Sequence, residues 1–187
     1  MNFLTTLTII FSLMSPSYFS NNFRIQPIQD LVDWQVGDRM EYKLDMTFLS
    51  GSSVRSVVSE ELVDGNQSIW VENIIDLIVK KQKVEQLIRR YDAAVLKMIV
   101  NGEEQDIPDP GEMDIVEQDY VKVTVPAGTF KSVWMKVNTK EIEGVEVWIN
   151  PKETAMDGML KMITPSQFGN MTMKLKSFYK VQRRANK

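Results

Sequence analysis

The chain of 187 residues contains no cysteine and no histidine. Without cysteine there is no disulfide framework, no thiolate nucleophile and no cysteine to carry an acyl anchor. Without histidine there is no imidazole base, no Ser-His-Asp triad and none of the commonest zinc and copper ligands. We therefore expect no catalytic residues, no metal site and no cofactor.

A strong charge of one sign is also lacking. The formal net charge is -3, the isoelectric point is about 5.2, and acidic and basic residues are mixed along the chain. A nucleic-acid backbone requires a basic stripe, so we expect no nucleic-acid partner. The content of 43% hydrophobic and 25% charged residues is that of an ordinary globular protein, and the length indicates one domain.

An apolar run without charged residues lies at the N-terminus, from Phe3 to Met14. It is too short to span a bilayer as a helix, but its length is typical of the apolar region of a secretory signal peptide. The segment Ser15-Pro16-Ser17 then supplies a helix breaker and small residues for cleavage after Ser17, with Ser20 as the alternative. A buried first strand or an uncleaved anchor is the competing interpretation.

We therefore predict a signal peptide over residues 1–17 and a single β domain over residues 18–187, with no transmembrane span in the mature chain. An exported chain without cysteine fits the bacterial envelope better than a disulfide-rich secreted domain of a eukaryote. The expected location is periplasmic or secreted.

Alternating apolar and polar residues predict strands through most of the mature chain. The clearest runs from Met40 to Phe48, and Asn101-Gly102 is a strong signal for a hairpin after a strand that ends at Val100. Further strands are predicted near Val54–Val63, Val121–Val125, Phe130–Val137, Glu141–Ile149, Met159–Ile163 and Met171–Leu175.

About ten short strands at regular spacing indicate a barrel, a half-barrel or a sandwich. We predict a mainly β fold, a curved antiparallel half-barrel or barrel, with one or two short helices. The helices are expected at Pro27–Trp34 and Asn150–Gly158, where proline suits the first helical position. The proline-containing acidic segment Asp106–Asp119 is expected to be a surface loop.

Residues 70–91 are ambiguous, because their apolar residues can also be placed on one face of a long helix. We favour strands over Ile69–Val79, Lys83–Tyr91 and Val95–Val100. Four β-branched residues, Ile74, Ile75, Ile78 and Val79, would crowd a helix but suit a sheet.

Three segments together resemble a known group of proteins: Val123–Phe130 (VTVPAGTF), Val147–Pro151 (VWINP) and Gly158–Met162 (GMLKM). Their order is similar to that in uncharacterised exported bacterial domains, which are similar in turn to the lipoprotein-localisation carriers LolA and LolB. The resemblance covers mainly Val121–Phe178. It implies an open, strongly curved antiparallel half-barrel whose apolar concave face holds acyl chains. The long lid helices of the carriers have no counterpart in this sequence, and no functional residue is carried over.

The leading hypothesis is a non-enzymatic envelope protein that holds a lipid, an acylated protein or another apolar ligand on a curved sheet. Methionine is flexible and suits a surface that accepts varied apolar partners, although it also fills gaps in ordinary cores. The alternatives are an interaction module that docks on another envelope protein through an edge strand or the acidic loop, and a carboxylate-dependent hydrolase. The expected apolar lining of the ligand site is Tyr42, Leu44, Met46, Phe48, Met135, Val137, Met171 and Met173.

Two tryptophans fall on the opposite side of the predicted strands. Trp134 and Trp148 alternate out of phase with the apolar positions of their strands. They therefore either cover a second core or form an exposed contact patch.

Overall fold

The structure, a computed structural model, describes residues 31–47, 49–78, 80–107, 114–139, 142–166 and 169–182. These residues contain eleven strands and no helix, and none of them forms a helix that is long and apolar enough to cross a membrane. The strands are β1 (Arg39–Asp45), β2 (Ser50–Val63), β3 (Asn66–Leu77), β4 (Lys80–Arg89), β5 (Val95–Val100), β6 (Glu103–Gln105), β7 (Asp114–Val125), β8 (Gly128–Asn138), β9 (Val145–Ile149), β10 (Met159–Thr164) and β11 (Met171–Tyr179).

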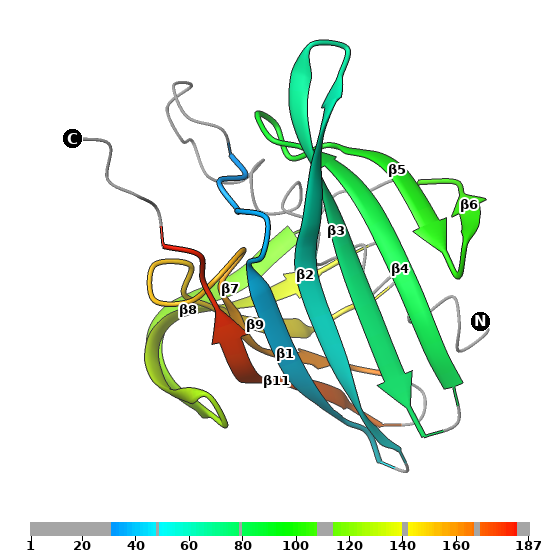
Figure 1. Ribbon diagram of the computed structural model, residues 1–187. Coiled ribbons are helices and arrows are strands. Elements are labelled where there is room, and N and C mark those ends of the chain that lie inside the picture. Colours follow the sequence, from blue (N-terminus) through cyan, green and yellow to red (C-terminus); the bar gives the residue numbers. More distant parts are fainter. Residues whose placement is uncertain are drawn as a thin grey trace.

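All eleven strands belong to one antiparallel sheet, in the order β6-β5-β4-β3-β2-β1-β11-β10-β9-β8-β7. The sheet is strongly bent, so that β7 to β10 run across behind the wall formed by β2 to β5 (Figure 1). It stays open, because β6 and β7 end the order and do not pair with each other. The prediction of a mainly β, antiparallel fold is confirmed. Of the two predicted shapes, half-barrel or barrel, the closed barrel is wrong.

The ambiguous stretch consists of strands. Residues 70–91 form most of β3 and β4, which pair in register from Ser68 with Arg89 to Leu77 with Lys80. The following strand spans Val95–Val100, the bounds that the sequence predicts, and turns at Asn101-Gly102, where both residues have positive φ. Such φ values belong to the tight hairpin turn that Asn-Gly favours.

The first helix prediction is wrong for the part that the structure describes. Residues 31–34 form no helix: the backbone N–H of Val32 donates to the carbonyl oxygen of Arg90 (3.0 Å). The guanidinium of Arg90 donates back to the carbonyl oxygens of Val32 (3.0 Å) and Trp34 (2.7 Å). This segment bonds to Arg90 instead of closing helical turns.

The second predicted helix is a closed loop between β9 and β10. Its expected cap is present, since Asn150 Oδ1 accepts the backbone N–H groups of Lys152 (3.1 Å) and Glu153 (3.0 Å). The chain then turns back, with positive φ at Met156 and Gly158, and Asn150 N–H donates to the carbonyl oxygen of Gly158 (2.8 Å). Left-handed residues at these positions stop a helix from extending.

The predicted acidic loop is shorter than expected. β7 begins at Asp114 and β6 occupies Glu103–Gln105, which leaves 106–113 between them, and 108–113 lie outside the described residues. β7 is exposed over most of its first eight residues. A strand at the edge of a sheet, solvated on both faces, lacks the alternation that identifies half-buried strands.

The turn between β7 and β8 folds back onto the middle of the sheet. The backbone N–H of Ala127 donates to the carbonyl oxygen of Leu175 on β11 (3.1 Å). The rings of Phe130 and Phe178 meet edge to face, with centroids 6.5 Å apart. The VPAG turn, one of the segments that carried the resemblance, thereby ties one end of the bent sheet to β11.

Candidate binding face on the inner side of the sheet

One face of the sheet is buried, and its apolar half lies on β8 to β11 and β1. Cross-strand partners share a face, so the register defines a continuous inner row over these five strands. Every member of that row is at most 5% exposed. From β8 to β1 the row is Met135, Val147, Met162, Met173 and Leu44.

On β2 to β4 the same face carries buried polar side chains among its apolar ones. Tyr42 on β1 is opposite Ser53, which is followed across the sheet by Ile75 and Gln82. Two residues farther along β2, Arg55 is opposite Asn73 on β3, and both residues are buried. The inner face therefore has a sulfur-rich apolar half and a half in which hydroxyl, amide and guanidinium groups lie among apolar side chains, which we call the polar half.

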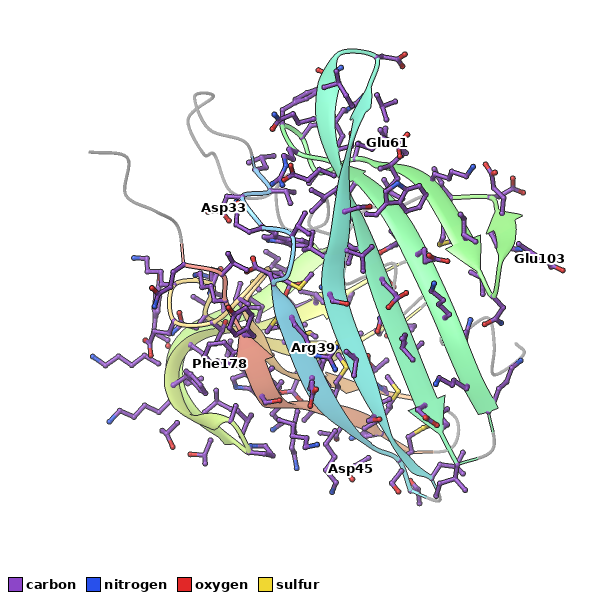
Figure 2. All side chains as sticks on the ribbon, in the orientation of Figure 1. Asp33, Arg39, Asp45, Glu61, Glu103 and Phe178 are labelled. Atoms are coloured by element: carbon purple, nitrogen blue, oxygen red, sulfur yellow. The ribbon has the colours of Figure 1, made fainter. Side chains whose placement is uncertain are left out.

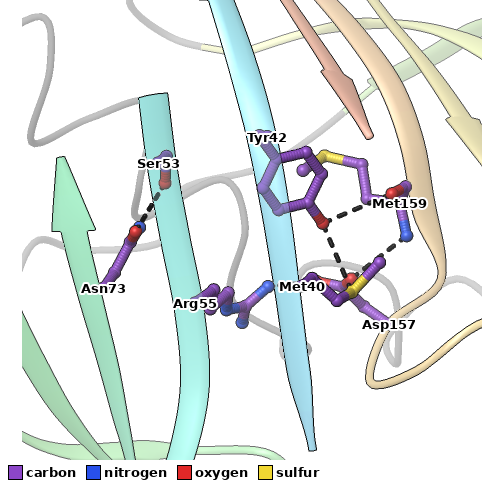
Figure 3. Close-up of polar contacts among 7 residues, drawn as sticks. All are labelled: Met40, Tyr42, Ser53, Arg55, Asn73, Asp157 and Met159. Atoms are coloured by element: carbon purple, nitrogen blue, oxygen red, sulfur yellow. Dashed lines mark hydrogen bonds and ion pairs between the residues drawn. The ribbon is translucent and has the colours of Figure 1, made fainter. Parts of the chain in front are cut away.

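A buried ion pair joins the polar half to the loop between β9 and β10 (Figure 3). Arg55 Nη1 bonds to Asp157 Oδ2, and their side chains are 2% and 7% exposed. The guanidinium also lies over the ring of Trp34, with Cζ 4.9 Å from the ring centroid. Asp157 Oδ1 accepts the backbone N–H of Met159 (3.2 Å). Burial of both charges is tolerable because each is paired and further bonded.

Tyr42 places a hydroxyl beside this ion pair. The hydroxyl contacts Met40 Sδ and donates to the carbonyl oxygen of Met159, both at 3.3 Å. The side chain is fully buried. Burial, reinforced by the carboxylate of Asp157, raises the pKa of Tyr42 well above its usual value of 10.0, although the charge of Arg55 acts in the opposite direction.

We expect the buried hydroxyl of Tyr42 to make the protein less stable in alkaline solution. Above about pH 10 the unfolded chain loses this proton while the folded protein keeps it. The free energy of unfolding should then fall by up to about 1.4 kcal/mol per pH unit from this group. Chemical denaturation between pH 9 and about 11.5 should show a shallower decline for Tyr42→Phe. Tyr120→Phe, at a tyrosine that is 80% exposed, should keep the wild-type slope, and equal slopes for all three proteins would contradict the expectation.

Some buried polar atoms on the sheet have no hydrogen-bond partner. On β4, Gln82 is 3% exposed and its Oε1 is unpartnered. Ser68 Oγ and Thr164 Oγ1 also have no hydrogen-bond partner, and both residues are fully buried. A buried acceptor without a donor destabilises the fold, so such groups indicate either unrelieved strain or a place for an absent donor.

The structure brings the predicted apolar lining together on the inner face. Six of its members are buried there, Met46 is half-buried and packs against the same core, and Phe48 lies outside the described residues. That these residues contact a ligand stays a prediction. The buried six are Tyr42, Leu44, Met135, Val137, Met171 and Met173.

Sequence reasoning missed the polar half of this face. Arg55, Asn73 and Gln82 were not singled out, because a charged or amide side chain within a strand normally indicates the solvated side. A signal was present in β2, where Ser53, Arg55 and Val57 share one phase of the alternation. Only the register shows that this phase is the buried one.

The described residues hold no group of three or more acidic side chains that could bind a metal ion. The predicted signal peptide lies outside the described residues.

No protein-family model and no curated protein matches the chain, but solved structures do. One is a protein taken to be exported, with a YmcC-like fold, from Bacteroides fragilis (13% identity, 82% of this chain, 100% of that chain, TM-score 0.49). Another is a protein taken to be a lipoprotein from Parabacteroides distasonis (10% identity, 82% and 100%, TM-score 0.42). A third is MucB (8% identity, 96% and 61%, TM-score 0.41).

Proposed function

We propose that the protein is a non-enzymatic binding protein of the bacterial envelope, which holds a lipid or another acyl-bearing ligand against the inner face of its bent sheet. The presence on that face of a methionine-rich row and, on β2 to β4, of buried polar groups is the observation that supports this function. An acyl chain would lie along the apolar row, and the polar end of the ligand would lie on β2 to β4.

The apolar half suits an acyl chain because of its side-chain chemistry. Met135, Met162 and Met173 occupy three of the five positions of the inner row. Methionine has three rotatable bonds and a polarisable sulfur, so it can change rotamer to fit around an entering chain. Each buried CH₂ of the ligand would contribute about 0.8 kcal/mol, which makes a long chain sufficient for stable binding.

The polar half suits a ligand with a hydrogen-bond donor. Gln82 Oε1 is a buried acceptor without a donor, on the same face as Ser53, whose Oγ bonds to Asn73 Oδ1 (2.7 Å). A hydroxyl or amide N–H of the ligand that reached Gln82 would relieve the unpaired acceptor. A pure hydrocarbon would not, so we propose an amphipathic ligand.

The direct test is native mass spectrometry of the protein purified from an envelope fraction, followed by organic extraction. A lipid or acyl species bound in near-equal amount to the protein would support the proposal. A ligand-free mass, together with no uptake of a fluorescent fatty acid, would refute it.

We expect Gln82→Met to separate binding from stability. It removes the unpartnered oxygen at similar volume, so the free energy of unfolding should rise by about 1 kcal/mol. The affinity for the extracted ligand should fall. Gln86→Met is the matched control on the same face of β4, because Gln86 is also buried but has no unpartnered buried atom. A gain in stability for Gln82→Met with unchanged affinity would remove Gln82 from the proposed site. Urea denaturation and titration with the extracted ligand measure the two quantities.

A second candidate function rests on β7. This strand has twelve residues, pairs only with β8 in the described sheet, and exposes Tyr120 (80%) and Val116 (49%). Long edge strands with open hydrogen-bonding groups are templates for strand addition. The protein would then dock a partner along β7. The same mass spectra would show this function as a protein complex in place of a lipid adduct.

A further inference from the structure

The outer face carries a row of side chains that matches the inner apolar row strand by strand. Trp134 on β8 is opposite Trp148 on β9, which is opposite Lys161 on β10. Lys161 is opposite Lys174 on β11, and Lys174 is opposite Lys43 on β1. We call these five residues the Trp–Lys row. Each lies one residue from a buried member of the inner row, so the row is on the outer side.

The tryptophans of the row are held in place and half-buried. Their ring centroids are 6.4 Å apart, and Trp134 Nε1 donates to Glu146 Oε2 (3.0 Å). Lys161 Nζ lies 4.2 Å from the centroid of Trp148. No carboxylate of the described residues forms an ion pair with Lys161 or Lys174, whereas Lys43 is paired with Asp45 (2.8 Å). Two of the three cations therefore lack a fixed counter-ion.

The surrounding strands are basic although the chain is acidic. β1 and β8 to β11 contain seven lysine or arginine residues and three acidic residues, a net charge of +4, whereas the whole chain has -3. Figure 2 shows Arg39 and Asp45, which end β1, at the margin of this region. The positive charge is concentrated on one part of the bent sheet.

We propose that the Trp–Lys row is a docking surface for a membrane that contains anionic phospholipids. Strands are about 4.8 Å apart, so the row extends over roughly 19 Å, enough to contact several headgroups. Lysine near an anionic bilayer is attracted to it, and tryptophan, with an apolar ring and a polar N–H, favours the bilayer interface. The paired tryptophans add apolar rings beside the lysines, the combination that suits the interface of an anionic bilayer.

The test is co-sedimentation with vesicles of equal parts phosphatidylglycerol and phosphatidylcholine, compared with phosphatidylcholine alone. We expect the wild-type protein to bind the anionic vesicles only, and added salt to weaken binding. Each lysine at such a surface contributes about fivefold in affinity, so Lys161→Glu/Lys174→Glu should bind about 25-fold more weakly or worse. Lys161→Gln/Lys174→Gln is a milder pair in case charge reversal impairs folding, which circular dichroism would reveal.

The matched control is Lys80→Glu/Lys122→Glu, the same charge change at two exposed lysines outside the row. It should bind as the wild type does. All variants share the same N-terminus, so any contribution from the predicted signal peptide cancels. Equal binding to both vesicle types, binding unchanged in both Lys161/Lys174 variants, or binding of an anionic polysaccharide without binding of vesicles would overturn the proposal.

Discussion

Gly158→Ala is expected to reduce the free energy of unfolding by at least about 4 kcal/mol, the range in which a single substitution is exceptional. A Cβ at this position would lie 2.2 Å from the backbone N of Pro151 and 2.4 Å from the carbonyl carbon of Asn150. Both atoms belong to the loop that closes on Gly158, so neither can rotate away. The φ of +75° adds strain for any residue with a side chain.

The loss should also disturb the inner face, because Gly158 separates Asp157 from Met159. Gly65→Ala is the matched control: its φ is +78°, but no atom lies within 4 Å of the added Cβ. This variant should lose only about 1–2 kcal/mol from the backbone strain. Urea denaturation of both variants separates strain from steric overlap. Equal losses would show that the contact with Pro151 is not responsible.

Arg55→Met is expected to reduce the free energy of unfolding by about 3–5 kcal/mol, because it leaves the carboxylate of Asp157 buried without its cation. The loss should exceed the hydrophobic gain from the new side chain, since Asp157 is only 7% exposed. The double variant Arg55→Met/Asp157→Leu should recover most of this stability, as buried ion pairs can be replaced by apolar residues at little cost.

Arg39→Met is the comparison for this effect. Arg39 bonds to Glu41 (2.9 Å), but the two side chains are 49% and 30% exposed. Loss of an exposed ion pair should change the free energy of unfolding by less than about 1 kcal/mol. An equally mild effect of Arg55→Met, or a double variant no more stable than the single one, would contradict the expectation. The buried carboxylate of Asp157 would then not depend on Arg55 for its stability.

Much of the fold could be predicted from the sequence, because local patterns determine most of its strands. Alternation located β1 and β11, and Asn101-Gly102 located the turn after β5. β6 and the first part of β7 were missed because edge strands in solvent have no buried phase. The helix expected after Asn150 failed for another reason: its capping residue is present, but two left-handed residues follow.

The candidate site was only half predictable. An apolar residue at an alternating position is buried in most sheets, so Met135 and Met173 were correctly placed on the inner face. Arg55 and Gln82 obey the same alternation, but a charged or amide side chain in a strand normally indicates a solvent-exposed position. Their burial depends on partners far away in the chain, such as Asp157, and on the register of β1 with β2 and β11. Neither can be read from neighbouring residues.

The pairing of β1 with β11 has a consequence for how the protein folds. Each half of the sheet is a meander, β1 to β6 and β7 to β11, in which every strand pairs with its neighbours in the chain. Such local pairings form quickly, whereas contacts between distant residues must first overcome the entropy of closing a long loop. Only the β1–β11 seam joins the halves by strand pairing, and it unites the first described strand with the last. The continuous sheet can therefore be completed only when the last strand is available, and the joining of two preformed meanders would be its slow step.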